Sequence, residues 1–218
     1  MMMTDSQIQT AVKNGEIVLD PFDPNRIEPA SYDVRVGNWA FASSSKEKLN
    51  LAQKGVLIIE AGEFAVLESR ERIELDNKTA GQLGLRSEYA RHGLLMLSGP
   101  QIDPGFKGII VVRMINLAPK SVALPYEAPF LTVQFFRLSH PVANLYSGPH
   151  QGQTGISAQD IQELVDTEGM TLGQVTKTLS ALAKDVSELR GSVGRLSWVL
   201  PLIVVIGMGV IGAVVALK

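Results

Sequence analysis

The sequence contains no cysteine, and this absence removes several kinds of chemistry at once. Disulfide bonds, thiolate nucleophiles, cysteine-ligated zinc and iron–sulfur clusters are excluded, and the composition fits a reducing compartment. An excess of positive charge is also missing, because 20 Lys and Arg residues stand against 22 Asp and Glu residues for a net charge of −2. Nucleic-acid backbones attract proteins through a basic field, so we expect no polymeric nucleic acid as a partner.

Motifs that announce a cofactor or a nucleophile through their spacing are absent as well. The histidines His92, His140 and His150 show no HxxxH or i,i+4 spacing, so we expect no histidine metal site. No GxGxxG, P-loop, GxSxG or HExxH string occurs. The N-terminal stretch MMMTDSQIQTAVKNGE is polar and lacks the apolar segment of a secretory signal, so we expect no cleaved signal.

A long uncharged run, WVLPLIVVIGMGVIGAVVAL, stands near the C-terminal end at residues 198–217. A helix of about 20 apolar residues matches the roughly 30 Å hydrocarbon core of a bilayer. Arg190 and Arg195 precede the run, and such positive charge favours the cytoplasmic side. We therefore predict a single-pass membrane anchor over 197–218 with the N-terminal domain in the cytoplasm. A buried globular helix is the alternative.

Before this run, apolar residues recur in alternating steps of three and four, which is the pattern of a coiled-coil seam. The seam comprises Leu172, Val175, Leu179, Leu182, Val186, Leu189, Val193 and Leu196. We predict a helical coiled-coil stalk over 158–196, opened by a short capped helix at Ser157–Leu164. A single amphipathic helix that folds back on its own domain is the alternative.

Between Gly15 and Leu138 the pattern changes to short apolar runs bounded by Gly, Pro and Asn. The runs are GEIVLD, SYDVRVG, GVLIIEAGEFAVLES, GIIVVRMIN, SVALPY and FLTVQFFRL. Such runs at this spacing are typical of an all-β barrel or sandwich. A helix at Ser6–Asn14 is expected to open the domain.

Five strings are more specific than this periodicity. They are IEPASYDVRVG (27–37), LRSEYARHGL (85–94), QIDPGFKGIIVVRMIN (101–116), FLTVQFF (130–136) and YSGPHQGQTG (146–155). In this order and spacing they resemble the dCTP deaminase and dUTPase superfamily over residues 5–157. The resemblance implies a homotrimer of distorted jelly-roll domains, with nucleotide sites at the subunit boundaries. It divides the chain into a β domain over 1–142 and a phosphate-closing arm over 143–157, followed by the stalk and the anchor.

The resemblance also assigns residues to the triphosphate and its metal. Arg86, Ser87 and Arg91 match the residues that hold the triphosphate, and a guanidinium fork suits phosphate oxygens. For Arg91, an ion pair at the trimer interface is the alternative. Asp33 matches an acidic residue near the metal–phosphate region, where Mg²⁺ carried with the nucleotide would be bound through water. A turn or capping role is the alternative for Asp33.

Other residues are assigned to the reacting end and to the arm. Asp103 matches an aspartate that orients the attacking water in the triphosphatases and lies in a binding hairpin in the deaminases. The resemblance implies that Phe106 stacks on the sugar, that Gln134 belongs to the site from the last core strand, and that Gln151 and Gln153 are the arm's contacts. A plain core role for Phe106 and backbone pairing for Gln134 are the alternatives.

One departure from the family pattern bears directly on the reaction. Arg113 stands where the deaminases place the glutamate that shuttles a proton. A guanidinium stays protonated and cannot act as a general base, so the sequence disfavours dCTP deamination. Arg113 is expected either to form an ion pair, with Glu88 as a candidate partner, or to contact ligand oxygens. The segment Leu95–Gln101 differs from both branches of the superfamily, which leaves the identity of the base open.

Three functions remain open at this point. The first is hydrolysis of a deoxynucleoside triphosphate, with dUTP as the leading candidate, to monophosphate and pyrophosphate, with Asp103 positioning water and magnesium neutralising charge. The second is a non-catalytic nucleotide sensor coupled to the transmembrane helix. The third is a trimeric membrane scaffold with a vestigial pocket.

Overall fold

The computed structural model describes residues 1–45, 47–167, 180–182 and 184–190. The contacts divide the chain into one unit over Met1–Thr171 and a second over Leu172–Lys218. The predicted transmembrane anchor lies outside the described residues, as does most of the predicted coiled-coil seam. Among the described residues, no helix combines the length and the apolar character needed to cross a membrane.

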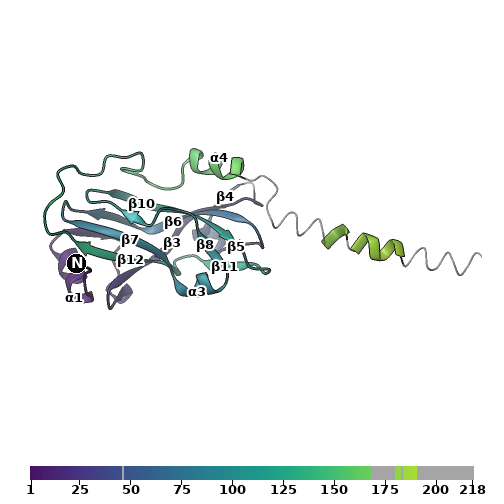
Figure 1. Ribbon diagram of the computed structural model, residues 1–218, viewed down its shortest axis with the longest axis horizontal. Coiled ribbons are helices and arrows are strands. Elements are labelled where there is room, and N and C mark those ends of the chain that lie inside the picture. Colours follow the sequence, from purple (N-terminus) through teal and green to yellow (C-terminus); the bar gives the residue numbers. More distant parts are fainter. Residues whose placement is uncertain (46, 168–179, 183, 191–218) are drawn as a thin grey trace, which may run out of the picture. The chain divides into compact units, whose positions relative to one another are not determined.

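A curled, ten-stranded antiparallel sheet forms most of the first unit (Figure 1). Seven of its strands follow in the order β8, β10, β6, β3, β12, β7 and β9, while β1, β2 and β4 pair at their flanks. The bounds are β1 Ile17–Asp20, β2 Ile27–Glu28, β3 Ser31–Ala42, β4 Lys48–Asn50, β6 Phe64–Leu75, β7 Thr79–Leu85, β8 Leu94–Met96, β9 Gln101–Ile102, β10 Lys107–Asn116 and β12 Pro129–Arg137. A separate two-stranded sheet joins β5 (Val56–Ile59) to β11 (Val122–Pro125).

Short helices decorate this sheet, so the first unit is mostly β rather than all-β. They are α1 (Asp5–Lys13), α2 (Leu51–Lys54), α3 (Ser87–Arg91) and α4 (Ala158–Thr167), with a 3-10 turn at Pro24–Arg26. The helices predicted at Ser6–Asn14 and Ser157–Leu164 are confirmed by α1 and α4. At the start of α1, the Thr4 backbone N–H donates to the Gln7 side chain, which closes the first turn.

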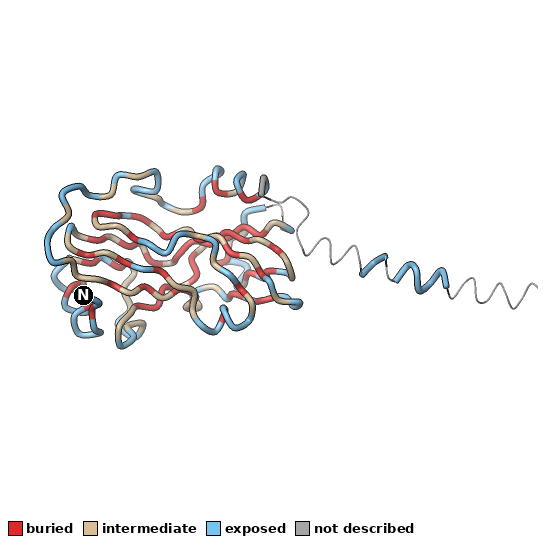
Figure 2. The backbone as a smooth tube through the Cα atoms, in the orientation of Figure 1, coloured by how far each residue is buried: buried red, intermediate tan, exposed pale blue. Residues whose placement is uncertain are grey.

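The alternation of side chains along β10 decides what that strand offers to the core and to the solvent-facing side. Val112 and Met114 are fully buried, and Arg113 between them therefore points to the opposite face of the sheet. Figure 2 shows buried residues following the strands through the middle of the domain. The exposed side of β10 is thus free to carry polar chemistry.

A second, smaller apolar cluster fixes α4 to the sheet. Leu164 of α4 and Ile156 before it pack with Phe41 and Val66, and Ile161 joins the same cluster. The Ile156 N–H also donates to the Glu68 carboxylate, and the Ile156 carbonyl accepts from the Lys48 ammonium. The start of the predicted stalk, as far as Thr167, is therefore docked on the domain.

The described residues of the second unit are two short helical segments, 180–182 and 184–190. Leu182, Val186 and Leu189 of the predicted seam are exposed there. Lys184 and Glu188 face each other with 3.9 Å between the ammonium nitrogen and a carboxylate oxygen. The coiled coil itself stays a prediction.

Candidate functional site

A cleft of about 880 Å³ opens on the exposed side of β10. Its other walls are the segment over 97–103, the arm and the first turns of α4. Five of the residues predicted from the sequence line this one cleft: Asp103, Phe106, Arg113, Gln151 and Gln153. The structure therefore brings together residues that lie between Asp103 and Gln153 in the sequence.

The turn before β10 presents Asp103 to the cleft. The Gln101 side-chain amide donates a hydrogen bond to the Asp103 carboxylate, which fixes the direction of that carboxylate. Gly105 has a φ of +86°, and a Cβ there would lie 2.7 Å from the Cβ of Leu145, so the turn requires glycine twice over. The IDPGFKG string is thus a tight hairpin that aims an acidic group at the ligand space.

Phe106 follows this turn, and its predicted stacking on a sugar stays a prediction. Its side chain is only 7% exposed and belongs to the main core cluster, yet it also lines the cleft. Its ring packs against Tyr146 of the arm with 5.8 Å between the ring centroids. Tyr146 lines the cleft as well, although it was not predicted as a site residue.

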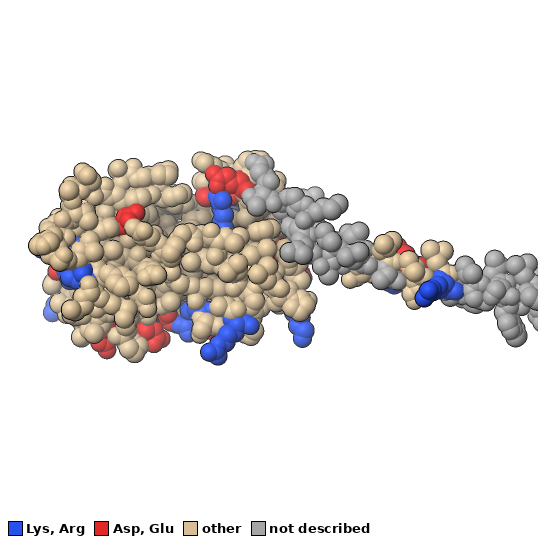
Figure 3. Space-filling model, viewed as in Figure 1, with Lys and Arg blue, Asp and Glu red and all other residues tan. Residues whose placement is uncertain are grey.

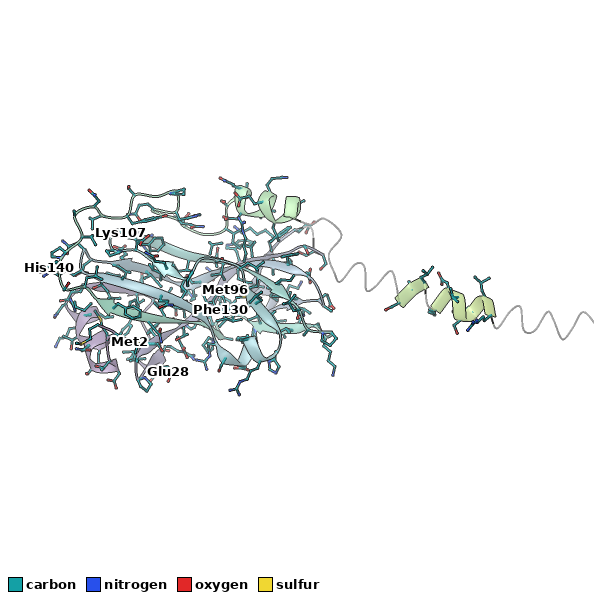
Figure 4. All side chains as sticks on the ribbon, in the orientation of Figure 1. Met2, Glu28, Met96, Lys107, Phe130 and His140 are labelled. Carbon is teal, nitrogen blue, oxygen red and sulfur yellow. The ribbon has the colours of Figure 1, made fainter. Side chains whose placement is uncertain are left out.

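The arm lies along the edge of β10 and is hydrogen-bonded to it. The Gly152 N–H donates to the Lys107 carbonyl at 2.7 Å, and the Ile109 N–H donates to the Gln153 carbonyl at 2.8 Å. The Gln151 side chain accepts from the Lys107 N–H at 2.9 Å and donates to the Gly105 carbonyl at 2.9 Å. Figure 4 places Lys107 beneath the arm. In this arrangement Gln151 braces the hairpin that carries Asp103.

Arg113 reaches α4. Its guanidinium forms an ion pair with Glu163 and lies 3.7 Å from a carboxylate oxygen of Asp160. Glu88, the candidate partner from the sequence, is replaced by these two acids because α4 docks beside β10. Figure 3 shows acidic atoms gathered over α4 directly beside a patch of basic atoms. The hydrogen bond from Arg113, followed by one from Gln159, lowers the pKa of Glu163.

The predicted triphosphate residues lie elsewhere in the chain. Arg86 precedes α3, Ser87 begins it and Arg91 ends it, and none of the three lines the cleft. The Arg86 guanidinium forms an ion pair with the carboxylate of Asp33 on β3, and Asp33 is only 4% exposed. Figure 1 shows α3 and α4 at opposite edges of the domain. Within one chain, the three predicted triphosphate residues therefore do not belong to the cleft.

Asp33 and Gln134 also lie away from the cleft. The Asp33 carboxylate is neutralised by Arg86, and the described residues contain no group of three or more acidic or histidine side chains that could hold a metal ion. The described residues therefore do not fit a resident magnesium site, and Mg²⁺ carried with the nucleotide stays a prediction. Gln134 is half-buried on β12, opposite Gln82 of β7.

Asp160, Glu163 and Ser98 line the cleft without having been predicted as site residues, although the sequence carries a signal for the two acids. Asp160 and Glu163 stand three positions apart, which places them on one face of a helix. Ser98 accepts the Arg113 backbone N–H at 2.8 Å and lies in the segment that departs from the family pattern. The capping arrangement of Ser157 with Asp160, at 2.9 Å from the N–H and 2.6 Å from the hydroxyl, agrees with the capped helix predicted at Ser157–Leu164.

A curled antiparallel sheet with a polar cleft on β10 and an arm folded along it defines the class of β domain to which the structure belongs. The crystal structure of 2'-deoxycytidine 5'-triphosphate deaminase from Agrobacterium tumefaciens has this fold, with a TM-score of 0.52 at 15% identity, covering 77% of this chain and 53% of that one. At this identity the likeness establishes the fold alone.

The sequence comparisons give the family. A dCTP deaminase-like family model matches residues 2–138. The chain is 35% identical to a dCTP deaminase of Pyrococcus horikoshii over 139 residues, or 64% of this chain and 87% of that protein. It is 31% identical to a dUMP-forming dCTP deaminase of Tropheryma whipplei over 179 aligned positions, covering 72% and 91% of the two chains. The chain belongs to the dCTP deaminase-like family, and α4 lies beyond the residues that the family model matches.

Proposed function

We propose that this protein binds a deoxynucleoside triphosphate in the β10 cleft without deaminating it. The observation that carries the proposal is the meeting of Asp103, Phe106 and the arm around one cleft of about 880 Å³. A cleft of this size suits a nucleotide. Curated relatives in the same family are dCTP deaminases, which supports a deoxynucleoside triphosphate as the ligand class.

The site is completed by a second copy of the chain in a homotrimer. The cleft contributes Asp103, Asp160 and Glu163 against the single guanidinium of Arg113, so its own charge does not favour a triphosphate. Arg91 of α3 is exposed and does not line the cleft of its own chain. Closed cyclic symmetry can place the α3 of one subunit beside the cleft of its neighbour. Cations and cleft then come from different chains.

Deamination is disfavoured by the chemistry around Arg113. The reaction needs a group that accepts and returns a proton near neutral pH. Arg113 cannot do so, and the nearest carboxylate, Glu163, has a pKa lowered by that same guanidinium. A lowered pKa makes this carboxylate a weaker base, so it accepts a proton less readily.

Hydrolysis to monophosphate and pyrophosphate is the second candidate, because the hydrogen bond from Gln101 orients the Asp103 carboxylate toward the cleft. A positioned carboxylate can align an attacking water. A nucleotide sensor without turnover uses the same cleft and differs only in this step.

One experiment separates these functions. The full-length protein is incubated with dATP, dGTP, dCTP, dTTP and dUTP and Mg²⁺ while binding, pyrophosphate release and ammonia release are measured. We expect binding without ammonia. Pyrophosphate release that is lost in Asp103→Asn identifies a diphosphatase, and binding without release identifies a sensor. Ammonia release from dCTP by the wild type, above a heat-inactivated control, would overturn the proposal.

Membrane attachment is part of the proposal and rests on the uncharged run at 198–217. We expect the full-length chain to partition into membranes and to resist carbonate extraction, while a chain truncated after Leu196 stays in the aqueous phase. Recovery of the full-length chain without detergent would contradict this.

A further inference from the structure

The net charge of the cleft depends on whether α4 is docked. With His150 counted as neutral, the described side chains that line the cleft carry three negative charges and one positive charge, a formal charge of −2. They are those of Asp103, Asp160, Glu163 and Arg113. Two of the three carboxylates belong to α4, and without them Asp103 and Arg113 would balance each other. Docking of α4 therefore supplies the whole negative excess of the cleft.

The acids of α4 also engage Arg113, the only guanidinium among the described residues of the lining. Glu163 forms an ion pair with it, and the hydrogen bond from Arg113 lowers the pKa of Glu163. One oxygen of Asp160 lies 3.7 Å from the same guanidinium, while the other accepts from both the N–H and the hydroxyl of Ser157. The first turn of α4 thus directs Asp160 toward Arg113.

The effect of these two carboxylates on an anionic ligand does not depend on how the ligand lies in the cleft. A cleft lined by an excess of one charge focuses the field between its low-dielectric walls, so an anion is disfavoured throughout the volume. Water and salt screen the field over about 8 Å at physiological ionic strength, so its strength falls with distance from α4. The Asp160 side chain is 12% exposed, which limits the screening of its own charge.

The attachment of α4 is weaker than that of the strands. Its one fully buried apolar side chain among the described residues is Leu164, which packs in a small cluster with Phe41, Val66 and Ile156, separate from the main core. A helix that buries so little apolar surface can separate from the sheet at a lower free energy than that of global unfolding. The two hydrogen bonds to the Ile156 backbone hold the preceding arm independently of α4.

We propose that α4 is an autoinhibitory element of the cleft. Docked, it engages Arg113 and adds two negative charges, and undocked, it leaves the cleft open to an anionic ligand. The inference rests on the proposed function, because the anion is the triphosphate proposed there. Docking of α4 and binding of a triphosphate then weaken each other by the same factor. A partner that binds α4 and removes it from the sheet would therefore raise the affinity for the nucleotide.

The test compares charged and uncharged ligands on the full-length protein. Dissociation constants are determined for dATP, dGTP, dCTP, dTTP and dUTP, for inorganic tripolyphosphate as a phosphate-only probe, and for deoxyuridine as an uncharged probe. In the double variant Asp160→Asn/Glu163→Gln we expect the triphosphates and tripolyphosphate to bind about tenfold more tightly, and this gain should shrink as salt is added. The affinity for deoxyuridine should change by less than about twofold.

Two further variants separate docking from charge. Leu164→Ala weakens the packing of α4 without altering any charge, so it should tighten the binding of the same anions. Glu28→Gln is the matched control for the removal of a negative charge. Glu28 is an exposed carboxylate of β2 on the side of the domain away from α4 (Figure 4), and its replacement should leave every affinity unchanged.

The reciprocal effect gives a readout on α4 itself. Amide hydrogen exchange of α4 in the wild type should become faster when tripolyphosphate saturates the protein, because the anion competes with the docked helix. A helix with a purely structural role would keep its exchange rates or exchange more slowly with ligand bound.

The outcomes distinguish the two proposals. If neither the wild type nor any variant binds a deoxynucleoside triphosphate, the proposed function falls and this inference falls with it. If the wild type binds one, and the double variant with a melting temperature like that of the wild type binds it no more tightly, the inference alone is overturned. Unchanged anion binding in Leu164→Ala, although its α4 amides exchange faster, would overturn it as well.

Discussion

The cleft face and the α3 face of the domain differ in charge and in completeness. The cleft is lined by three carboxylates and by one guanidinium, that of Arg113. This guanidinium is already paired with Glu163 of α4. The α3 face presents Arg91 to solvent, with Arg86 paired to the buried Asp33, but neither arginine lines the cleft. Each face contains what the other lacks for a triphosphate site. The comparison teaches that the proposed triphosphate site needs residues from two chains.

The strongest test of this comparison is complementation between subunits. Gly99 lines the cleft, and a Cβ there meets nothing within 4 Å, so Gly99→Trp fills the cleft without straining the fold. Arg91→Glu reverses the exposed charge of α3. Each variant alone should bind no triphosphate. Mixed oligomers refolded or co-expressed at equal ratio should recover about a quarter of the sites, because one intact cleft must meet one intact α3.

Binding is counted per chain by equilibrium titration. As a control, each variant is mixed with itself, which should recover nothing. If the mixture also recovers nothing, although mixed oligomers are demonstrated by differently tagged chains, the two faces do not share a site.

The next effect is on stability and sets Arg86 apart from Arg91. Arg86→Ala leaves the carboxylate of Asp33 buried without its partner, and we expect a loss of about 2–3 kcal/mol in the free energy of unfolding. This is below the usual cost of breaking a fully buried pair because Arg86 is 30% exposed. Urea unfolding measures it. Arg91→Ala should stay within about 0.5 kcal/mol of the wild type.

Asp33→Asn in the Arg86→Ala background removes the stranded charge and should restore part of the loss. Equal destabilisation by Arg86→Ala and Arg91→Ala would show that the pair with Asp33 does not contribute to folding.

Much of this arrangement could be predicted from the sequence, and the parts that could not have a common cause. Long apolar runs predicted the strands that carry the sheet, such as β6 and β10, and a capping pattern predicted α4. The short strands β8 and β9 were not predicted, because pairing with β10 and β7 makes them strands rather than their own few residues. The local pattern of apolar and capping residues can be read from the sequence, whereas the pairing of strands cannot.

The same limit applies to the site. The strings around Asp103 and Gln151 predicted residues that share a cleft, since they follow one hairpin and the arm beside it. The partner of Arg113 was not predictable, because it depends on where α4 docks after some forty intervening residues. Asp33 and Arg86 were assigned to one ligand, and the structure pairs them with each other.

The next prediction tests whether Arg91 binds phosphate or only supports the subunit interface, and its expected effect is similar in size to that of Arg86→Ala on stability. Arg91→Ala should weaken the binding of a triphosphate by ~1.5–3 kcal/mol, the range for hydrogen bonds to charged groups, and leave the corresponding nucleoside almost unaffected. Titration calorimetry with the triphosphate and the nucleoside of one base measures the difference. An equal loss for both ligands would make Arg91 a structural residue of the subunit interface.

The smallest expected effect concerns pH and Glu68, the buried carboxylate of β6 that accepts the Ile156 N–H. Burial raises the pKa of Glu68 above that of an ordinary glutamate, against the opposing hydrogen bonds from Ile156 and Trp39 and the charge of Lys48. The folded state then binds the proton more readily than the unfolded state, so stability contributed through this group increases as pH falls through the folded pKa. Relative to Glu68→Gln, the wild type should gain melting temperature between pH 7 and about pH 4.5. A difference that does not vary with pH would contradict this.

The clamp on Ile156 has a mechanical consequence. Glu68 holds its N–H, Lys48 holds its carbonyl, and Lys48 itself lies 5.0 Å from the centroid of the Trp39 ring. Tension applied to the chain beyond Thr167 would reach α4 first and this clamp next, before it reached any strand of the sheet. The two hydrogen bonds to Ile156 would therefore bear a force on the C-terminal chain before the arm and the Asp103 hairpin did.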